Sequence, residues 1–283
     1  MTQLLAFLNA NAALFFLIGA LALIALNAWR YWGERDLVPQ YQARKQATPP
    51  SLNSQPPVTA LVPAWNEGAE LDGHVESFLA LRYPNKSLVL VAGGREGDDT
   101  LARAQAFAAQ HDKIVAIPQQ AGRGKQVALR DGLPHITGEI VFLTDADCLY
   151  NDQGFERTIA PIINGDAQAT TGGSSLRPDQ QDNPLVLFQW IRERLYTIKA
   201  PDESSGMLGR NCAVATDVLL ASGGFDAEAP SGTDYTLARQ LIAHGVTIRH
   251  IRLSQTPTEY PADLRTYYNK HTRWLRNLIV LGW

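Results

Sequence analysis

The feature that most constrains the fold of this chain is a short apolar run followed by two carboxylates. Residues 140–143 read Ile-Val-Phe-Leu, and Asp145 and Asp147 follow. Such a run fits a buried strand of a parallel sheet, and open α/β sheets bind ligands at the carboxyl ends of their strands. Carboxylates there suit Mg²⁺ or Mn²⁺, which share oxygen ligands with substrate phosphates. The structural alternative is that both residues belong to a loop that caps the next helix.

Strands and helices alternate along the rest of the chain. The spacing predicts strands over residues 58–62, 88–92, 113–117 and 140–143. Helical periodicity follows the first strand, Asp98-Asp99-Thr100 begins a helix that runs to about His111, and a long helix covers residues 184–196. This alternation predicts an α/β fold with a doubly wound, mainly parallel sheet.

The N-terminal segment carries no charged side chain from Thr2 to Trp29. A helix needs roughly 20 such residues to cross the hydrocarbon core of a membrane. A signal peptide would carry a basic start and a shorter apolar core, so we predict an uncleaved transmembrane helix over residues 1–29. Arg30, Arg35, Arg44 and Lys45 follow this segment, and no Lys or Arg precedes it. The positive-inside rule then places the main domain on the cytoplasmic face of the cell inner membrane.

The remaining domain boundaries follow from composition. A juxtamembrane segment and Pro-rich linker is expected over residues 30–56, the main domain over 57–262, and an amphipathic interface helix over 263–283 that runs into a second membrane segment. The bland alternative for that last helix is packing on the domain with its charges solvated. A net charge of −3 gives no sign of nucleic-acid binding, and two cysteines exclude a disulfide framework.

Two further motifs suggest phosphate binding and proton transfer. Gly122-Arg123-Gly124-Lys125 precedes a predicted helix, and glycines and cations at a helix start suit a diphosphate. The alternative is an ordinary solvated loop. Asp234 lies at the start of an amphipathic helix, where it is either an N-cap or a general base.

Five segments then occur in a characteristic order. They are Pro63-Ala64-Trp65-Asn66-Glu67, Gly124-Lys125, Asp145-Ala146-Asp147, Gly232-Thr233-Asp234 and Lys270-His271-Thr272-Arg273-Trp274. Over about residues 57–277 they resemble the Pro-Ala-Tyr-Asn-Glu, Gly-Lys, Asp-x-Asp, Thr-Glu-Asp and Gln-x-x-Arg-Trp motifs of the membrane-bound family-2 glycosyltransferases. This inverting group includes the cellulose, hyaluronan and poly-N-acetylglucosamine synthases.

The resemblance implies a GT-A fold with a Rossmann-like nucleotide-binding half and an acceptor half. It also implies a divalent metal, Mg²⁺ or Mn²⁺, held by Asp145 and Asp147, with Asp234 as the catalytic base. Nucleotide-sugar binding is carried over to Pro63, Ala64, Asn66, Glu67, Arg123, Lys125 and Asp145. Thr233, Arg273 and Trp274 are carried over as the acceptor and diphosphate site. The implied reaction moves a sugar from a nucleotide diphosphate sugar, a UDP-sugar by preference, to a lipid or polysaccharide acceptor.

The chain departs from the family pattern at three places. Gly93-Gly94-Arg95-Glu96 stands where the family has Asp-Asp-Gly-Ser, one Asp of which contacts uracil, so recognition by backbone or by Arg95 is the alternative. Thr233 replaces Glu, and Lys270 replaces Gln. These changes favour a second hypothesis, a catalytically weak, membrane-anchored homologue that binds nucleotide sugar or scaffolds a polysaccharide synthase. Nucleotidyl transfer on a similar fold is a third.

The C-terminal residues bear on how a product would leave the cell. Processive family members continue into several more membrane helices, whereas residues 278–283 supply only the start of one. Three alternatives remain open at this point: a transferase that forms no channel, a partner subunit that supplies the channel, or a fragment of a longer chain.

Overall fold

The computed structural model describes residues 11–35, 39, 42, 51–120, 124–229 and 232–281. The chain divides into two compact units, Met1–Ala47 and Thr48–Trp283. Within the first unit, helix α2 (Ala12–Glu34) contains a 19-residue stretch, Ala12–Arg30, with a mean hydropathy of 2.2. By length and composition this stretch could cross a membrane.

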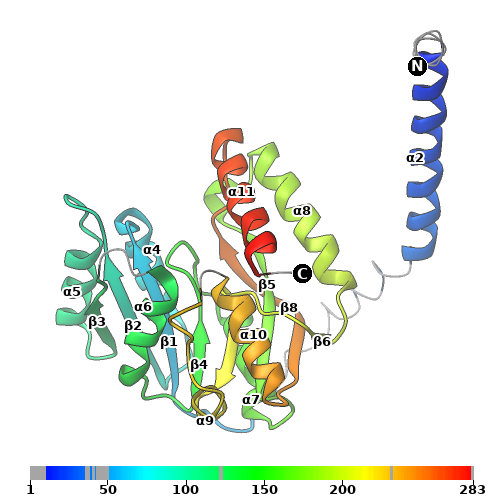
Figure 1. The fold of residues 1–283 in the computed structure, drawn as a ribbon. Helices are drawn as coiled ribbons and strands as arrows, with labels where there is room; N and C mark the ends of the chain where they lie inside the picture. The colour runs from blue at the N-terminus through cyan, green and yellow to red at the C-terminus, as the bar shows by residue number, and fades with distance from the viewer. Residues whose placement is uncertain are drawn as a thin grey trace. The chain divides into compact units, whose positions relative to one another are not determined.

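The second unit is built on one mixed sheet (Figure 1). In the described part of the chain the strand order is β3-β2-β1-β4-β7-β5-β8-β6. The strands are β1 (Val58–Trp65), β2 (Lys86–Gly93), β3 (Ile114–Pro118), β4 (Ile140–Leu143), β5 (Ala169–Leu176), β6 (Glu203–Ser204), β7 (Cys212–Ala215) and β8 (Ile248–Thr258). The pairs β1–β2, β1–β4, β2–β3 and β5–β8 are parallel, whereas β7 pairs antiparallel with β4 and β5, and β6 pairs antiparallel with β8. The prediction of a mainly parallel α/β sheet is therefore confirmed.

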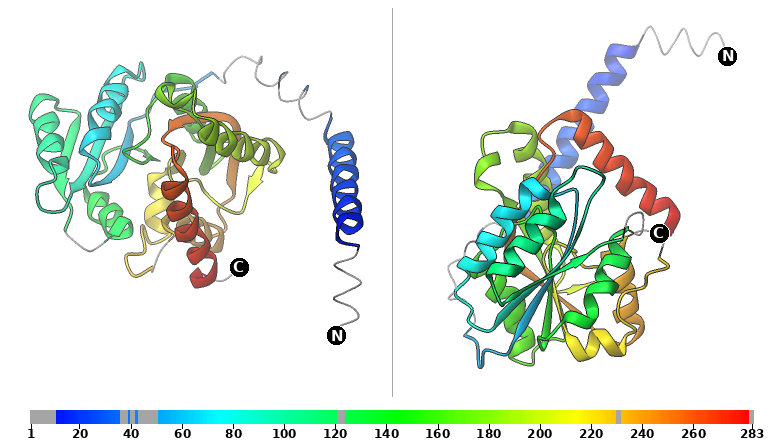
Figure 2. Two further views of the ribbon diagram at one scale, coloured as in Figure 1. Left: turned by 90° about the horizontal axis from the view of Figure 1, so that it is seen from above. Right: turned by 90° about the vertical axis from the view of Figure 1, so that its left-hand side faces the viewer.

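Helices cover both faces of the sheet (Figure 2) because strand side chains alternate between them. On one face, Ala60, Val62 and Leu90 pack against helices α4 (Gly68–Ala80), α5 (Thr100–Gln110) and α7 (Asp152–Ile163). On the other, Leu61 and Val89 pack against α6 (Gly124–Gly132), α9 (Thr216–Ala221) and α10 (Thr233–Ala243). Two long helices, α8 (Pro184–Lys199) and α11 (Leu264–Leu281), and short 3₁₀ turns at Leu133–His135 and Pro178–Gln180 complete the described elements.

The direction in which successive strands are added to the sheet reverses at β1. The chain adds β2 and then β3 on one side of β1, and then returns to place β4 on the other side. The loops that leave β1 and β4 consequently diverge, which opens a crevice at the carboxyl ends of these two strands. The residues that follow β1, beginning with Asn66, and those that follow β4, including Asp145, flank this crevice.

The second half of the sheet is joined to the first by β7, which pairs with both β4 and β5. The pairing of β5 with β8 is irregular between Thr171 and Gly173. At this irregularity a Cβ on Gly172 would lie 2.4 Å from Asn211 Nδ2 and 2.8 Å from Ser254 Oγ. Asn211 Nδ2 donates to Gly173 O at 2.8 Å and to Ser254 Oγ at 3.0 Å, so a buried polar cluster takes the place of a side chain there.

Candidate active site

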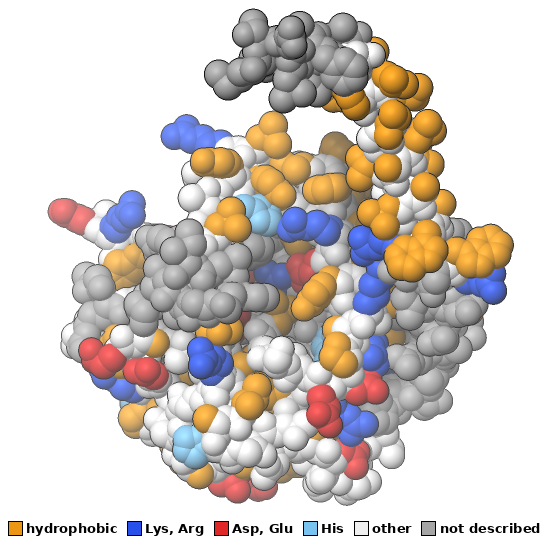
Figure 3. Space-filling view, turned by 45° about the vertical axis from the view of Figure 1, so that its right-hand side comes forward, with side chains coloured by type: hydrophobic (Ala, Val, Ile, Leu, Met, Phe, Trp, Pro, Cys, Tyr) orange, Lys and Arg blue, Asp and Glu red, His pale blue; other side chains and the backbone are white. Residues whose placement is uncertain are grey.

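An ion pair lies at the crevice between β1 and β4. Lys125 is the second residue of α6, and Asp145 follows β4 by two residues. The Lys125 ammonium donates to the Oδ1 atom of Asp145. The two side chains remain 36% and 34% exposed, so a ligand entering the crevice can reach both. Figure 3 shows a hollow in this unit with basic and acidic side chains inside it.

Two more carboxylates lie near this pair. Burial, followed by the charges of Asp147 and Asp145, raises the pKa of Glu67 to about 8. Burial and the charge of Asp145 also raise the pKa of Asp147, although Lys270 of α11 acts in the opposite direction. Crowded carboxylates resist ionisation, and a bound cation removes that penalty. The electrostatics of the crevice therefore favour a cation beside Asp145 and Asp147.

The residues fit a divalent cation that is shared with a substrate. In the described part of the chain, no group of three or more His, Cys, Asp or Glu side chains is arranged to hold a metal by itself. Mg²⁺ in phosphate-binding enzymes is commonly held by one or two protein carboxylates plus substrate phosphates and water. Asp145 and Asp147 supply such a pair, and phosphate oxygens would complete the shell.

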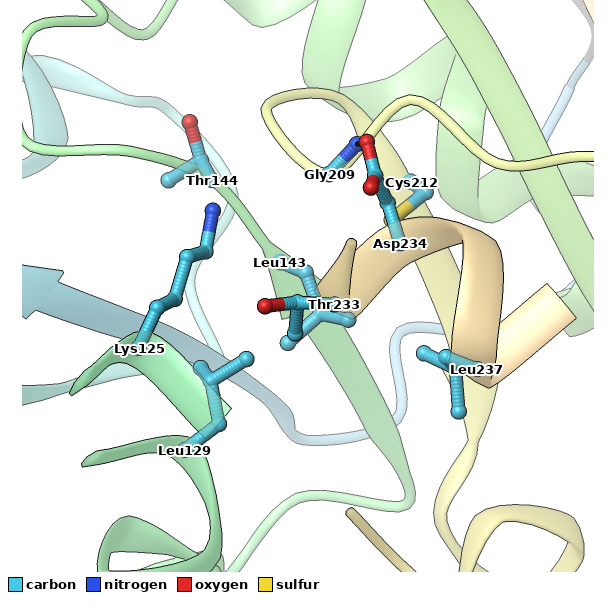
Figure 4. A pocket seen from close by; sticks show the side chains of 9 residues that line it. All are labelled: Lys125, Leu129, Leu143, Thr144, Gly209, Cys212, Thr233, Asp234 and Leu237. Atoms are coloured by element: carbon cyan, nitrogen blue, oxygen red, sulfur yellow. Dashed lines mark hydrogen bonds between the residues drawn. The ribbon is translucent and has the colours of Figure 1, made fainter. Parts of the chain in front are cut away.

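Asp234 lies across a small pocket from Lys125 (Figure 4). Helix α10 begins at Thr233, and its N-cap is Gly232 with a φ of 68°, so the alternative that Asp234 is the N-cap is wrong. Instead, the Gly209 N–H donates to Asp234 Oδ2 at 3.4 Å. The Thr233 side chain lies between the Asp234 and Lys125 sides of this pocket. A carboxylate held in this way can accept a proton from a ligand.

The residues carried over from the Pro-Ala-Tyr-Asn-Glu motif occupy two kinds of environment. Pro63 and Ala64 continue strand β1, which was expected to end at Val62, and both are buried. Asn66 is exposed with a φ of 57°, and its Oδ1 accepts from the Arg95 N–H at 2.8 Å. Asn66 thereby joins the loop after β1 to the loop after β2, where the Gly93-Gly94 departure lies.

Some of the predicted site residues lie outside the described part. Arg123 is among them, and so are the side chains of Arg273 and Trp274, although their backbone belongs to α11. That helix nevertheless reaches the crevice, because the charge of its Lys270 lowers the pKa of Asp147.

The sequence did not predict a buried charged cluster next to the site, which is formed by Arg210, Glu193, Ser174 and Tyr260. Arg210 is 8% exposed, and its guanidinium donates to Ser174 Oγ at 2.6 Å and to Glu193 Oε2 at 2.7 Å. The Tyr260 hydroxyl donates to the same Glu193 oxygen at 2.9 Å. Burial alone raises the pKa of Glu193, but Arg210 outweighs it and the pKa lies below its ordinary value. The only signal in the sequence was a single Glu among the apolar and basic residues of α8.

Arg210 also connects two parts of the site through its backbone. The Thr144 hydroxyl donates to Arg210 O at 2.9 Å, immediately before the Asp145-Ala146-Asp147 segment. On the other side, Arg210 follows Gly209, whose N–H reaches Asp234. The buried cluster thus holds the loop that lies between the carboxylate pair and Asp234.

A neutral histidine, His74, holds the loop that carries Asp145 and Asp147. His74 of α4 is fully buried, and its Nδ1–H donates to Cys148 O at 2.7 Å. Burial lowers the pKa of His74 to about 4. The unfolded chain takes up this proton near pH 6.5, whereas the folded chain takes it up only near pH 4. The contribution of neutral His74 to the free energy of unfolding is therefore fully present above pH 6.5 and is lost as the pH falls toward 4.

We expect this effect to appear as acid sensitivity of the fold. Between pH 7 and pH 5 the free energy of unfolding should fall with a limiting slope of about 1.4 kcal/mol per pH unit from His74. Denaturant unfolding of the purified chain, followed by Trp fluorescence at both pH values, measures it. The His74→Gln variant keeps an N–H donor but does not titrate, so it should lose less stability over this interval. Equal losses in the two proteins would contradict the assignment.

The fold and the crevice together define a nucleotide-binding α/β protein with a carboxylate pair suited to a phosphate-bound cation. Residues 56–277 match the family model described as glycosyltransferase like family 2. The chain therefore belongs to glycosyltransferase family 2.

Curated relatives agree with this assignment. The chain is 22% identical over 245 residues to "Probable glycosyltransferase YdaM" of Bacillus subtilis (strain 168), covering 80% of this chain and 56% of that protein. Over 96 residues it is 30% identical to the poly-beta-1,6-N-acetyl-D-glucosamine synthase of Staphylococcus epidermidis, covering 34% of this chain and 23% of the synthase. The chain thus spans about half the length of the first of these relatives.

Solved structures show the same fold. A mannosyltransferase from Pyrobaculum calidifontis in complex with GDP-Man and Mn²⁺ superposes with a TM-score of 0.63 at 22% identity, covering 90% of this chain and 72% of that one. GalNAc-T7 with UDP, GalNAc and Mn²⁺ gives a TM-score of 0.56 at 14% identity, covering 75% and 45%. These likenesses confirm the prediction of a GT-A fold.

Proposed function

We propose that this protein is an inverting glycosyltransferase that moves a sugar from a nucleotide diphosphate sugar to a lipid or polysaccharide acceptor. The observation that carries the proposal is that Lys125 is paired with Asp145, which lies near Asp147, and faces Asp234 across one small pocket. The cation and the carboxylates would serve the two ends of one transfer, which are departure of a diphosphate and deprotonation of an acceptor.

Each residue has a distinct task in this mechanism. Asp145 and Asp147 would hold Mg²⁺ or Mn²⁺ together with the donor phosphates. When bound, the metal neutralises charge on the diphosphate. Lys125 adds positive charge to the same oxygens, and Arg123 and Arg273 are proposed to assist it. Trp274 is proposed as an apolar floor for the acceptor.

Asp234 accepts the proton of the acceptor hydroxyl as that oxygen bonds to the anomeric carbon. The bond from this carbon to the diphosphate breaks, and its electron pair leaves with the diphosphate. Attack from the face opposite the leaving group inverts the anomeric carbon. The Gly209 N–H orients the Asp234 carboxylate for this step.

The proposal extends to the setting of the domain. Residues 1–29 would anchor the chain in the cell inner membrane, residues 30–56 would link the anchor to the transferase domain over 57–262, and residues 263–283 would lie at the membrane interface. The cations after Trp29 support a position of the domain on the cytoplasmic side. Other subunits could supply an export channel to such an enzyme.

The test is nucleotide diphosphate release by membranes that contain the protein, over a panel of UDP- and GDP-sugars with Mn²⁺ or Mg²⁺. We expect release from one donor, loss of release in EDTA and recovery on adding back the metal. The same panel identifies the nucleotide base that is bound beside Gly93-Gly94.

A second test concerns the metal. Asp147→Asn should weaken Mn²⁺ binding, measured by electron paramagnetic resonance with nucleoside diphosphate present. Asp112→Asn, at an exposed loop carboxylate, is the matched control. Metal-independent release would contradict the role given to Asp145 and Asp147, whereas no release from any donor with acceptor extracts present would favour the nucleotide-sugar-binding scaffold instead.

A further inference from the structure

The pocket between Lys125 and Asp234 has a polar mouth and an apolar floor (Figure 4). The Lys125 ammonium and the Asp234 carboxylate lie together on one side of it, and Leu129 and Leu237 lie on the other. The Lys125 side chain is 36% exposed, whereas each of the two leucines is only 2% exposed. The polar side is therefore the mouth, and the leucine side is the floor.

The floor suits a small apolar group. Its remaining members are Leu143 of β4 and Cys212 of β7, which are also buried. The Thr144 hydroxyl lines the pocket as well, but it already donates to Arg210 O at 2.9 Å. A ligand hydroxyl on this floor would lose its water without gaining a good partner, whereas a methyl group would gain carbon contacts. The cavity volume is about 10 Å³, which admits one group of this size.

The pocket is open because residue 233 is short. Thr233 lines the pocket, and its side chain lies between the Lys125 side and the Asp234 side. The motif that this segment resembles has Glu at the same position, and a Glu side chain is longer by two bonds. Such a side chain would extend into the space that Thr233 leaves open. The departure of the chain from the family pattern thus has a structural consequence at this pocket.

The proposed reaction determines which part of a donor sugar would lie over the pocket. Lys125 would contact the diphosphate, and Asp234 would accept a proton on the opposite face of the anomeric carbon. Since both residues line the pocket, the pocket would lie beside that carbon. The neighbouring ring carbon, C2, carries a hydroxyl in simple hexoses and an acetamido group in 2-acetamido sugars. The acetamido group ends in a methyl.

We propose that the donor of this protein is a nucleotide diphosphate 2-acetamido sugar, and that its acetamido methyl fills the pocket. The amide then lies at the polar mouth, where the Thr233 hydroxyl can donate to its carbonyl oxygen. The inference rests on the proposed function, because that function places the sugar. A carbon group that fits an apolar pocket changes affinity by about 10–200-fold.

The test is equilibrium binding of matched probes to the full chain in detergent with Mn²⁺. The probes are UDP-N-acetylglucosamine with UDP-glucose, and UDP-N-acetylgalactosamine with UDP-galactose. We expect the acetamido member of each pair to bind about 10–200-fold more tightly. Thr233→Gln, which fills the pocket without adding a charge, should remove most of this preference. Thr233→Ser keeps the hydroxyl and the open space and should retain it, and UDP alone should bind equally to all three proteins.

A second variant enlarges the floor. Leu237→Val removes one carbon, so this protein should bind UDP-N-propanoylglucosamine, which has one more methylene, about tenfold more tightly than the unchanged protein does. The matched control is Leu220→Val, at a leucine of α9 that is 54% exposed. This control should not change the affinity for either acyl group.

Two results would overturn the proposal. Equal affinities within both matched pairs would show that the pocket is a packing defect that no substrate group fills. A preference that Thr233→Gln leaves intact would place the acetamido group elsewhere in the protein. Neither result depends on turnover. A preference of the expected kind in a protein that releases no UDP would support the pocket and would contradict the proposed transfer, so the two failures are distinguishable.

Discussion

Replacing Asp234 by Asn should lower the turnover of this protein by about 10²–10⁴-fold, the usual contribution of a positioned general base. The amide keeps the size of the side chain and retains an oxygen that can accept from the Gly209 N–H, but it cannot take the acceptor proton. Donor affinity should change little, because Lys125 and the Asp145–Asp147 pair are untouched. The measurement is the initial rate of nucleotide diphosphate release at saturating donor.

A measurement of stability distinguishes this catalytic role of Asp234 from a structural one. Gly232, not Asp234, is the N-cap of α10, so Asp234→Asn removes only a first-turn charge, worth about 0.3–1 kcal/mol. Asp112→Asn serves as the matched control and should retain full turnover. Near-normal turnover in a folded Asp234→Asn protein would contradict the base assignment. A loss of turnover that tracked a loss of folded protein would point to structure alone.

The second large effect concerns the cluster behind the site. Arg210→Met leaves the largely buried Glu193 carboxylate without its guanidinium partner, and breaking a buried ion pair from one side costs about 3–5 kcal/mol. We expect the free energy of unfolding, measured with denaturant, to fall by about 3 kcal/mol because Tyr260 still donates to Glu193. The exposed pair Arg82–Asp152 supplies the control, since Arg82→Met should cost about 1 kcal/mol or less.

A second substitution tests the cause of that loss. Adding Glu193→Leu to Arg210→Met removes the unpaired charge, and replacing both members of a buried pair by apolar residues is often close to neutral. The double variant should therefore be more stable than Arg210→Met alone. If the two substitutions added their costs independently, the loss would come from packing and not from an orphaned carboxylate.

The parts of the fold that were predictable are those with a local signal. Strand β4 has the predicted bounds, because four apolar residues between polar neighbours leave little choice of register. Strand β1 is longer than predicted because Pro63 was taken to end it. The pairing of β1 with β4 stops at Leu61, so Pro63 lies where β1 has β2 as its one neighbour, and a missing N–H is tolerated at such an edge.

Other features depend on contacts between distant segments. Helix α8 was expected from its sequence, but ordinary periodicity places apolar residues inward, whereas here Arg210 and Pro261 draw the polar side inward. The antiparallel insertion of β7 likewise has no local signal in the sequence. For the candidate site, Lys125, Asp145, Asp147 and Asp234 were expected together. Lys125 and Asp234 do line one pocket, and Lys125 is paired with Asp145, which lies near Asp147. The Arg210–Glu193 pair joins residues 17 positions apart and was not foreseen.

The continuity of the sheet across the site has a mechanical consequence. Strand β7 is hydrogen-bonded to β4 on one side and to β5 on the other, so one continuous sheet runs beneath both the proposed donor region and the proposed acceptor region. A hinge rotation of one half against the other would have to break that sheet, unlike the clamshell closure of enzymes whose halves meet through a linker. Substrate-driven ordering is therefore left to the loops at the rim, and exchanging those loops should alter which sugars are accepted while the frame beneath stays the same.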